Sequence, residues 1–286
     1  MKAPWETVNL IKKNMDPATT ASLAGAFAAG LLTHMSVMVS DIPNHDGLAS
    51  VYSNQDLLTS GRWFLQFACG ISSYYALPWL IGVLSLIYIA VASAFTVKIL
   101  DIRRPLYAAL AGVILAVFPA LASDFAYVFT MDGYMLGMLL SVIAVYLVGR
   151  GKWGFVLGGV LLSLSVGTYQ AYLAVAMILC LYKAIGVLFD KEDKKALRIA
   201  KYPCMGAIGL VLYYAVLKVL LAVRHTSLAD YQGIGGEGAG TGIITRLTGA
   251  YRDFAVFTLK SKIMAAGPAA KTTYFLLTAG ALVLLV

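Results

Sequence analysis

The chain has few charged residues and few cysteines for its length. Only 13% of its 286 residues are Asp, Glu, Lys or Arg, whereas a typical soluble domain has about 25%. Its three cysteines, Cys69, Cys180 and Cys204, stand far apart and match neither a disulfide framework nor a zinc-binding spacing. The composition therefore argues against a soluble domain, a disulfide framework and a zinc site.

Long hydrophobic runs fill most of the sequence. Hydrophobic residues make up 60% of the chain, and a helix needs about 20 apolar residues to cross a bilayer. The runs are continuous rather than alternating, which favours helices over a strand barrel. The predicted spans lie near 18–39, 77–99, 106–122, 126–148, 153–168, 170–189, 203–222 and 272–286. We predict an all-α, polytopic transmembrane helical bundle of about eight spans, the last one truncated relative to a longer native protein.

The positive net charge of +8 follows a topological pattern. If the N-terminus is cytoplasmic, most Lys and Arg residues fall in the inside segments, as the positive-inside rule requires. The surplus therefore predicts an orientation and gives no evidence for nucleic acid. The apolar run after Lys13 is long enough to span the bilayer, so we interpret it as an uncleaved anchor rather than a signal peptide.

Four parts are expected along the chain. Residues 1–16 read as a cytoplasmic amphipathic lead, and Asp16-Pro17 marks the start of the first span. Residues 17–222 form a transmembrane core with an external loop at 40–76, and the charged stretch at 189–201 is expected to be a solvated turn. Residues 223–271 hold an external glycine-rich loop and an interfacial helix. Residues 272–286 begin a further span.

The external loop is the most informative segment. It reads DIPNHDGLASVYSNQDLLTSGRWFLQF and contains three carboxylates, a histidine and an arginine: Asp41, Asp46, Asp56, His45 and Arg62. A plain connection between two helices needs only a few turn residues. This one is long, acidic and partly helix-forming, which is typical of a site rather than a link.

Other unusual polar residues are predicted at the same outer level. They are Asp124, Asp132, Tyr134, Tyr169, Gln170, Tyr172, Arg224 and His225. Asp132 follows Asp124 by eight residues, or about 12 Å along a continuous helix. An acid within a membrane span is costly and points to a functional site, with a partner or a water-filled cavity.

Each candidate also has a simpler interpretation. Asp46 could be the turn residue of an Asp-Gly pair, Asp56 could cap a helix, and Arg62 could extend to lipid headgroups. Gln170 could bond a neighbouring helix, and the tyrosines could belong to an aromatic belt. His34 lies inside the first span and is expected to be a packed, neutral histidine.

An acidic external pocket beside lipid suits sugar transfer from a polyprenyl phosphate. A carboxylate would act as general base on an acceptor hydroxyl, and the sugar would pass through an oxocarbenium-like transition state. Arg62, Arg224 and His225 are candidates for neutralising the departing phosphate. A transporter or flippase of a lipid-linked sugar is the alternative, although the acids cluster towards one face. A non-catalytic membrane partner is a third reading.

Three blocks resemble one family. NHDGLASVYSNQDLLTSGRWF, FPALASDFAYVFTMDGYMLGMLL and GTYQAYLAVA are similar, in this order, to motifs of the GtrII-like, serotype-converting glucosyltransferases. That resemblance implies a GT-C-like fold and a bacterial inner-membrane enzyme of O-antigen modification. It implies Asp46 as the catalytic acid in the first external loop, with Asp41 as second choice. Asp132 and Tyr134 match the later motif.

The resemblance also implies partners. The donor would be a polyprenyl-phosphate-linked sugar, the acceptor a cell-surface glycan, and a donor synthase and a flippase would act alongside. We expect substrate contacts from Arg62, Asp56, Asp132, Tyr134, Tyr169, Gln170, Arg224 and His225. No cofactor is expected. Two nearby aspartates and a histidine could hold a divalent ion, but no compact ligand run is present, so we expect none.

Overall fold

The computed structural model is mainly helical in the part of the chain that it describes. It describes residues 15–40, 44–50, 53–70, 75, 77–190, 194–229, 242–256, 272 and 276. Within these residues, an isolated bridge between Leu57 and Arg62 stands outside any strand. The chain divides into two compact units, Met1–Leu228 and Ala229–Val286.

The candidate membrane-spanning helices among the described residues belong to the first unit. Five described helices are long and apolar enough to cross a bilayer: α2 (Pro17–Val39), α6 (Pro78–Ile99), α9 (Met131–Val148), α11 (Tyr172–Phe189) and α12 (Lys195–Val223). The pair α7 (Pro105–Val117) and α8 (Pro119–Phe125) bends by 48° and adds a sixth candidate. The apolar α10 (Gly154–Thr168) is shorter. The predicted all-α polytopic bundle is confirmed.

Prolines mark where several of these helices begin. Pro17, Pro78, Pro105 and Pro119 each stand at the first position of a helix, where a missing backbone N–H leaves no bond unmade. The predicted start at Asp16-Pro17 is confirmed, because the Asp16 carboxylate accepts a bond from the Thr19 N–H at 2.8 Å.

Three predicted boundaries differ from the structure. The helix predicted over 126–148 begins only at Met131, so Asp124 and Asp132 do not share one continuous helix. The helix predicted from 203 begins at Lys195 and contains Pro203, so most of the expected charged turn is helical. The run at 106–122 breaks at Phe118, because Pro119 cannot donate the next bond.

The remaining predicted segments are covered in part. In the second unit, α13 (Ile243–Ala255) is the helix expected in residues 223–271, and its sequence is strongly amphipathic. Residues 1–14, the glycine-rich stretch at 231–241 and nearly all of 272–286 lie outside the described residues.

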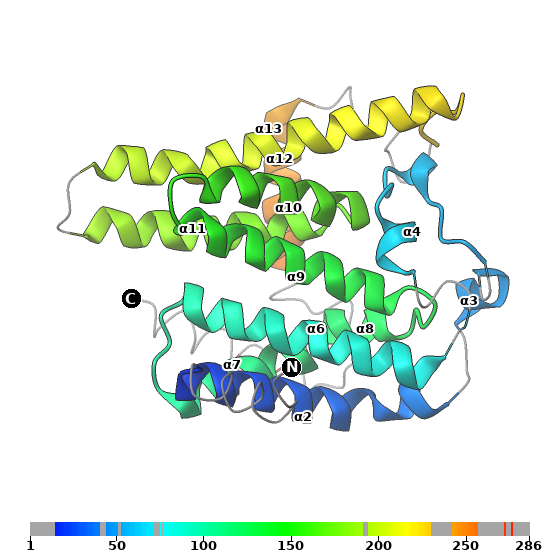
Figure 1. Cartoon of the computed structure of the whole chain (residues 1–286), viewed down its shortest axis with the longest axis horizontal. Coiled ribbons are helices and arrows are strands. Elements are labelled where there is room, and N and C mark those ends of the chain that lie inside the picture. Colours follow the sequence, from blue (N-terminus) through cyan, green and yellow to red (C-terminus); the bar gives the residue numbers. More distant parts are fainter. Residues whose placement is uncertain are drawn as a thin grey trace, which may run out of the picture. The chain divides into compact units, whose positions relative to one another are not determined.

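Small residues bring the helices of the first unit close together. A Cβ atom at Gly112 in α7 would lie 2.4 Å from the Ser22 carbonyl oxygen in α2, and one at Gly25 would lie 2.8 Å from the Ala109 carbonyl oxygen. Such close backbone approach is typical of helices packed in membranes. α6 then packs on α9, α9 on α10, and α10 on α12 (Figure 1).

His34 packs at the bend between α7 and α8. The break leaves carbonyls at the end of α7 without helical partners, and His34 Nε2 lies 2.9 Å from the Ala116 carbonyl oxygen. The ring also stacks on Phe125 with centroids 3.9 Å apart. The prediction that His34 is packed is therefore confirmed.

The connections alternate between two ends of the bundle. At one end lie α3 (His45–Ser50), the 3₁₀ helix η1 (Leu58–Ser60), α4 (Leu65–Ala68) and the starts of α9 and α11; Figure 1 shows α3 and α4 at this end, on the right. At the other end lie the connections at 100–104 and 149–153, the end of α11 and the start of α12. The external loop therefore lies at the same end as the starts of α9 and α11.

Candidate active site

A tight turn presents Arg62. Gly61 follows η1 with φ of 75°, a left-handed conformation that favours glycine. A Cβ atom there would also lie 2.7 Å from both Gln170 Nε2 and Tyr213 Oη. The Arg62 N–H then donates to the Leu57 carbonyl at 3.0 Å and closes the turn. Only glycine fits both the dihedral angle and the space.

Tyrosines from two other segments surround the Arg62 guanidinium. Nη1 donates to Tyr134 Oη at 3.2 Å, and Cζ lies 4.6 Å from the centre of the Tyr169 ring. The Tyr134 and Tyr169 rings are 5.3 Å apart, and Tyr169 meets Tyr172 edge-on at 5.7 Å. Arg62, Tyr134, Tyr169 and Tyr172 are called the Arg62 cluster below.

Two buried polar atoms of the cluster have no bonding partner among the described residues: Arg62 Nε and Tyr172 Oη. Tyr172 is only 7% exposed, and both Arg62 and Asp124, in α8, lie within electrostatic range of it. An unmade bond on a buried donor is costly. The cluster thus has two donors to which a bound ligand could form hydrogen bonds.

Gln170 ties the turn to the rest of the bundle. Its Nε2 donates to the Ser60 carbonyl at 2.9 Å, and Tyr213 Oη, from α12, donates to the Gly61 carbonyl at 3.1 Å. Gln170 therefore bonds across segments, as one of its two interpretations proposed, and it positions Arg62. Sequence reasoning missed Tyr213, because a lone tyrosine in an apolar span has the pattern of a packing residue.

Asp132 is buried in the first turn of α9. Its exposed fraction is 1%, and Oδ1 accepts the Gly133 N–H at 2.9 Å. The start of a helix favours negative charge, and Tyr88 of α6 is within electrostatic range. Asp132 and Tyr134 therefore stand two positions apart in α9, but Tyr134 belongs to the Arg62 cluster and Asp132 lies in the packed interior.

Asp56 and Arg224 form an ion pair. Asp56 Oδ1 also accepts the Leu58 N–H at 3.4 Å, so it partly caps η1, as its simpler interpretation proposed. Arg224 ends α12, and the exposed His225 follows with φ of 49°. Because Asp56 compensates Arg224, the guanidinium of Arg62 is the stronger candidate for a ligand anion.

Asp46 lies on α3, away from these contacts. It is half exposed, and its Oδ1 is 3.1 Å from His45 Nε2. Asn44, rather than Asp46, caps this helix through a 2.8 Å bond from the Gly47 N–H. No hydrogen bond or ion pair joins Asp46 to the Arg62 cluster in the described part of the chain. Asp41 lies outside the described residues.

Metal-ligating groups do not gather in the described residues. Within the ranges given above, no three His, Cys, Asp or Glu side chains lie close enough to hold a metal ion. The described side chains offer anion binding by Arg62 and proton transfer by exposed carboxylates.

Comparison with known protein families gives a match over most of the chain. A family model described as "Glucosyl transferase GtrII" matches residues 35–286 and so includes the external loop, the Arg62 cluster and α12. No curated protein and no solved structure matches the chain.

Proposed function

Because the chain belongs to the GtrII glucosyltransferase family, we propose that it moves a hexose, glucose first among them, from a polyprenyl phosphate to a cell-surface glycan. The observation that carries the proposal is the Arg62 cluster. Its guanidinium is held between tyrosines from α9 and the start of α11, and two buried donors have no partner among the described residues. This arrangement suits the phosphate of a lipid-linked donor.

Arg62 is proposed to bind the donor phosphate. A guanidinium presents paired N–H donors to phosphate oxygens, and such charge-assisted bonds are about twice as strong as neutral ones. In the transfer, the bond between the anomeric carbon and the phosphate oxygen breaks, and the phosphate leaves with its electron pair. Arg62 stabilises that growing negative charge, and Tyr134 fixes the orientation of the guanidinium.

Asp46 is proposed as the general base, with Asp41 as second choice. The acceptor hydroxyl attacks the anomeric carbon as its proton passes to the carboxylate, and the glycosidic bond forms through an oxocarbenium-like transition state. The half-exposed position of Asp46 leaves room for a polymeric acceptor. The remaining sequence-predicted contacts, including Asp132, Gln170 and the Asp56–Arg224 pair, would shape the pocket.

The proposed orientation places this site outside the cytoplasm in a bacterial inner membrane. The opposite end carries basic residues in its short connections, including Arg103, Arg104, Arg150 and Lys152, as expected for a cytoplasmic face. The enzyme would then bind the lipid-linked donor in the outer leaflet. This requires a synthase that makes the donor and a flippase that moves it across the membrane. A GT-C-type architecture agrees with a catalytic loop between the first two spans.

The test is sugar transfer in proteoliposomes. The purified chain would receive polyprenyl-phosphate glucose and a glycan acceptor, with Asp46→Asn and Asp41→Asn beside the wild type. Asp253→Asn, an exposed carboxylate of α13, is the control. We expect transfer by the wild type and the control and none by Asp46→Asn. Full activity in Asp46→Asn would remove it as base, and lipid-linked sugar crossing the bilayer without transfer would favour the flippase.

A further inference from the structure

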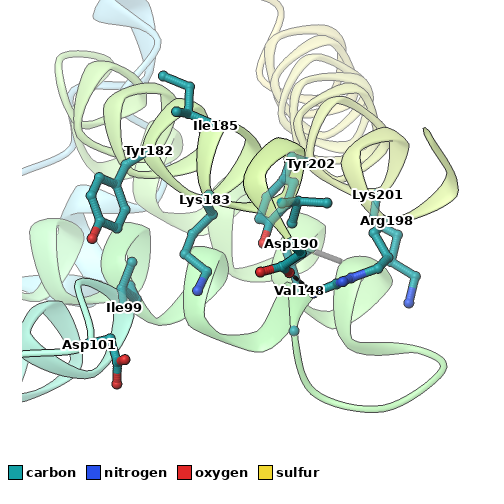
Figure 2. A pocket seen from close by; sticks show the side chains of 13 residues that line it. Ile99, Asp101, Val148, Tyr182, Lys183, Ile185, Asp190, Arg198, Lys201 and Tyr202 are labelled. Carbon is teal, nitrogen blue, oxygen red and sulfur yellow. Dashed lines mark ion pairs between the residues drawn. The ribbon is translucent and has the colours of Figure 1, made fainter. Parts of the chain in front are cut away.

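A charged cavity of about 500 Å³ lies at the end of the bundle opposite to the Arg62 cluster. It is lined by the last residues of α6, α9 and α11 and by the first turns of α12, whereas the Arg62 cluster uses the starts of α9 and α11. Tyr182 Oη donates to the Leu100 carbonyl at 3.1 Å and links α11 to the end of α6 beside the cavity. Figure 2 shows Lys183 on one side and Arg198 and Lys201 on the other, with Asp190 between them.

Two lysines of the cavity, Lys183 and Lys201, have no ion-pair partner among the described residues. Arg198 pairs with Asp190 at 2.9 Å, and Asp101 pairs with Arg103 at 2.9 Å. Lys183 lies within electrostatic range of Asp101. Neither Lys183 nor Lys201 makes a hydrogen bond or an ion pair within the described ranges. Both side chains are partly buried. The described lining residues, three basic and two acidic, therefore carry a net positive charge suited to one anionic group.

An apolar groove adjoins this cavity. It measures about 480 Å³ and runs between α10, α11 and α12, with Leu162, Met177, Leu181 and Gly206 among its lining residues. Tyr202 lines both the cavity and the groove. The side chains of Met177 and Leu181 are each 62% exposed, so the groove opens to the surroundings of the bundle. A cationic cavity joined to an apolar groove is complementary to an anionic amphiphile.

We propose that this cavity and groove bind one anionic phospholipid of the bilayer, with its phosphate between Lys183 and Lys201 and an acyl chain along the groove. Anionic lipids are concentrated in the cytoplasmic leaflet, which the basic end of the bundle is proposed to face. The site is separate from the donor site, since the two occupy opposite ends of α9 and α11. The bound lipid would fasten α11 to α12, the helices that supply Tyr172 and Tyr213.

The experiment measures lipid binding and thermal unfolding of the full chain in detergent. Phosphatidylglycerol is titrated beside phosphatidylcholine, inorganic phosphate and polyprenyl phosphate. We expect phosphatidylglycerol, but neither phosphatidylcholine nor inorganic phosphate, to raise the unfolding midpoint through this cavity. In the double variant Lys183→Gln/Lys201→Gln the affinity for phosphatidylglycerol should fall by about 25-fold, because each lysine near an anionic lipid contributes about fivefold. Stabilisation by polyprenyl phosphate at the proposed donor site should persist in Lys183→Gln/Lys201→Gln.

Two further variants separate the cavity from general surface charge and from the groove. Arg104→Gln/Lys152→Gln removes two exposed charges at the same end and should leave binding unchanged. Gly206→Leu should fill the groove and abolish the effect; a Cβ atom at Gly206 meets nothing within 4 Å, and leucine favours helix.

Several outcomes would overturn the proposal. Equal loss in Arg104→Gln/Lys152→Gln would show a diffuse charge effect, and unchanged binding in Gly206→Leu would show that no chain enters the groove. Equal stabilisation by inorganic phosphate would mean a free-anion site. Stabilisation by polyprenyl phosphate and not by phosphatidylglycerol, if lost in Lys183→Gln/Lys201→Gln, would mean a second isoprenoid site in this cavity. Lipid binding is read without glucosyl transfer, so its failure is independent of failure of the proposed function.

Discussion

Two arginines lie over tyrosine rings in the same way, at opposite ends of the bundle. Arg62 Cζ is 4.6 Å from the Tyr169 ring centre, and Arg150 Cζ is 4.6 Å from that of Tyr146. Each also donates to a tyrosine hydroxyl, Tyr134 or Tyr146. Arg150 is exposed in a short connection, whereas Arg62 has a buried Nε without a partner among the described residues.

The difference teaches that the pairing itself does not make a site. An exposed arginine on a tyrosine can settle at the headgroup level, with its charge in water. A partly buried arginine with an unmade hydrogen bond carries a desolvation cost, and a bound ligand that accepts that bond would remove the cost. The two arginines differ in burial, because Arg62 belongs to the long external loop that packs on the bundle and Arg150 belongs to a short, exposed connection.

Removing the two arginines in turn tests this comparison most directly. Arg62→Ala should lower glucosyl transfer by at least about 100-fold, as loss of a charge-stabilising donor typically does. Arg150→Ala should leave transfer within about twofold of the wild type. Initial rates in proteoliposomes would measure both, and equal losses would show that neither arginine acts on the donor.

Tyr134→Phe sharpens the comparison by removing only the hydroxyl that holds Arg62. We expect a fall in transfer of about tenfold, because a hydrogen bond to a charged group is worth about 1.5–3 kcal/mol. Tyr146→Phe is the matched change beside Arg150 and should have little effect. Rates over a range of donor concentrations would separate weaker donor binding from slower chemistry, and an unaltered Tyr134→Phe enzyme would contradict the positioning role.

Two glycines at opposite ends extend the same test to the backbone. Gly61 and Gly151 both have positive φ, 75° and 68°, which costs a non-glycine residue about 1–2 kcal/mol. A Cβ atom at Gly61 would also meet Gln170 and Tyr213, whereas one at Gly151 meets nothing within 4 Å. Gly61→Ala should therefore lower the unfolding midpoint more than Gly151→Ala, and it alone should impair transfer. A similar loss in both would mean that strain alone matters.

The smallest expected effect concerns the cap of α2. Bonds from the Thr19 side chain and backbone lower the pKa of Asp16 below 3.8, so its ionised form stabilises the folded state. That contribution is present above pH 3.8 and is lost as the pH falls through the folded-state pKa. Asp16→Asn keeps a capping oxygen, so its unfolding midpoint should lie slightly below that of the wild type at pH 7. The gap should close under acid, and a constant gap would argue against the charge.

The sequence predicted that the residues of the Arg62 cluster lie near one membrane surface, but it did not predict their contacts. Arg62, Tyr134, Tyr169 and Gln170 were placed at one level by hydropathy, because span boundaries show which residues lie near the same membrane surface. The hydrogen-bond partners could not be predicted from the sequence, because they are far apart in the chain. Arg62 and Tyr134 are 72 positions apart, and Gly61 and Tyr213 are 152 positions apart. The break at Phe118 was also missed, although Pro119 was its signal.

The sequence by itself determined the helical membrane class, the family and most helix starts, because hydropathy, motif order and proline at the first helical position are local properties of the chain. The tertiary structure decided which tyrosines enclose Arg62 and which charges pair. It also showed that Asp132 is buried, whereas Asp46 is half exposed. Those outcomes depend on how distant helices pack, and side chains of the same type enter different surroundings once that packing is set.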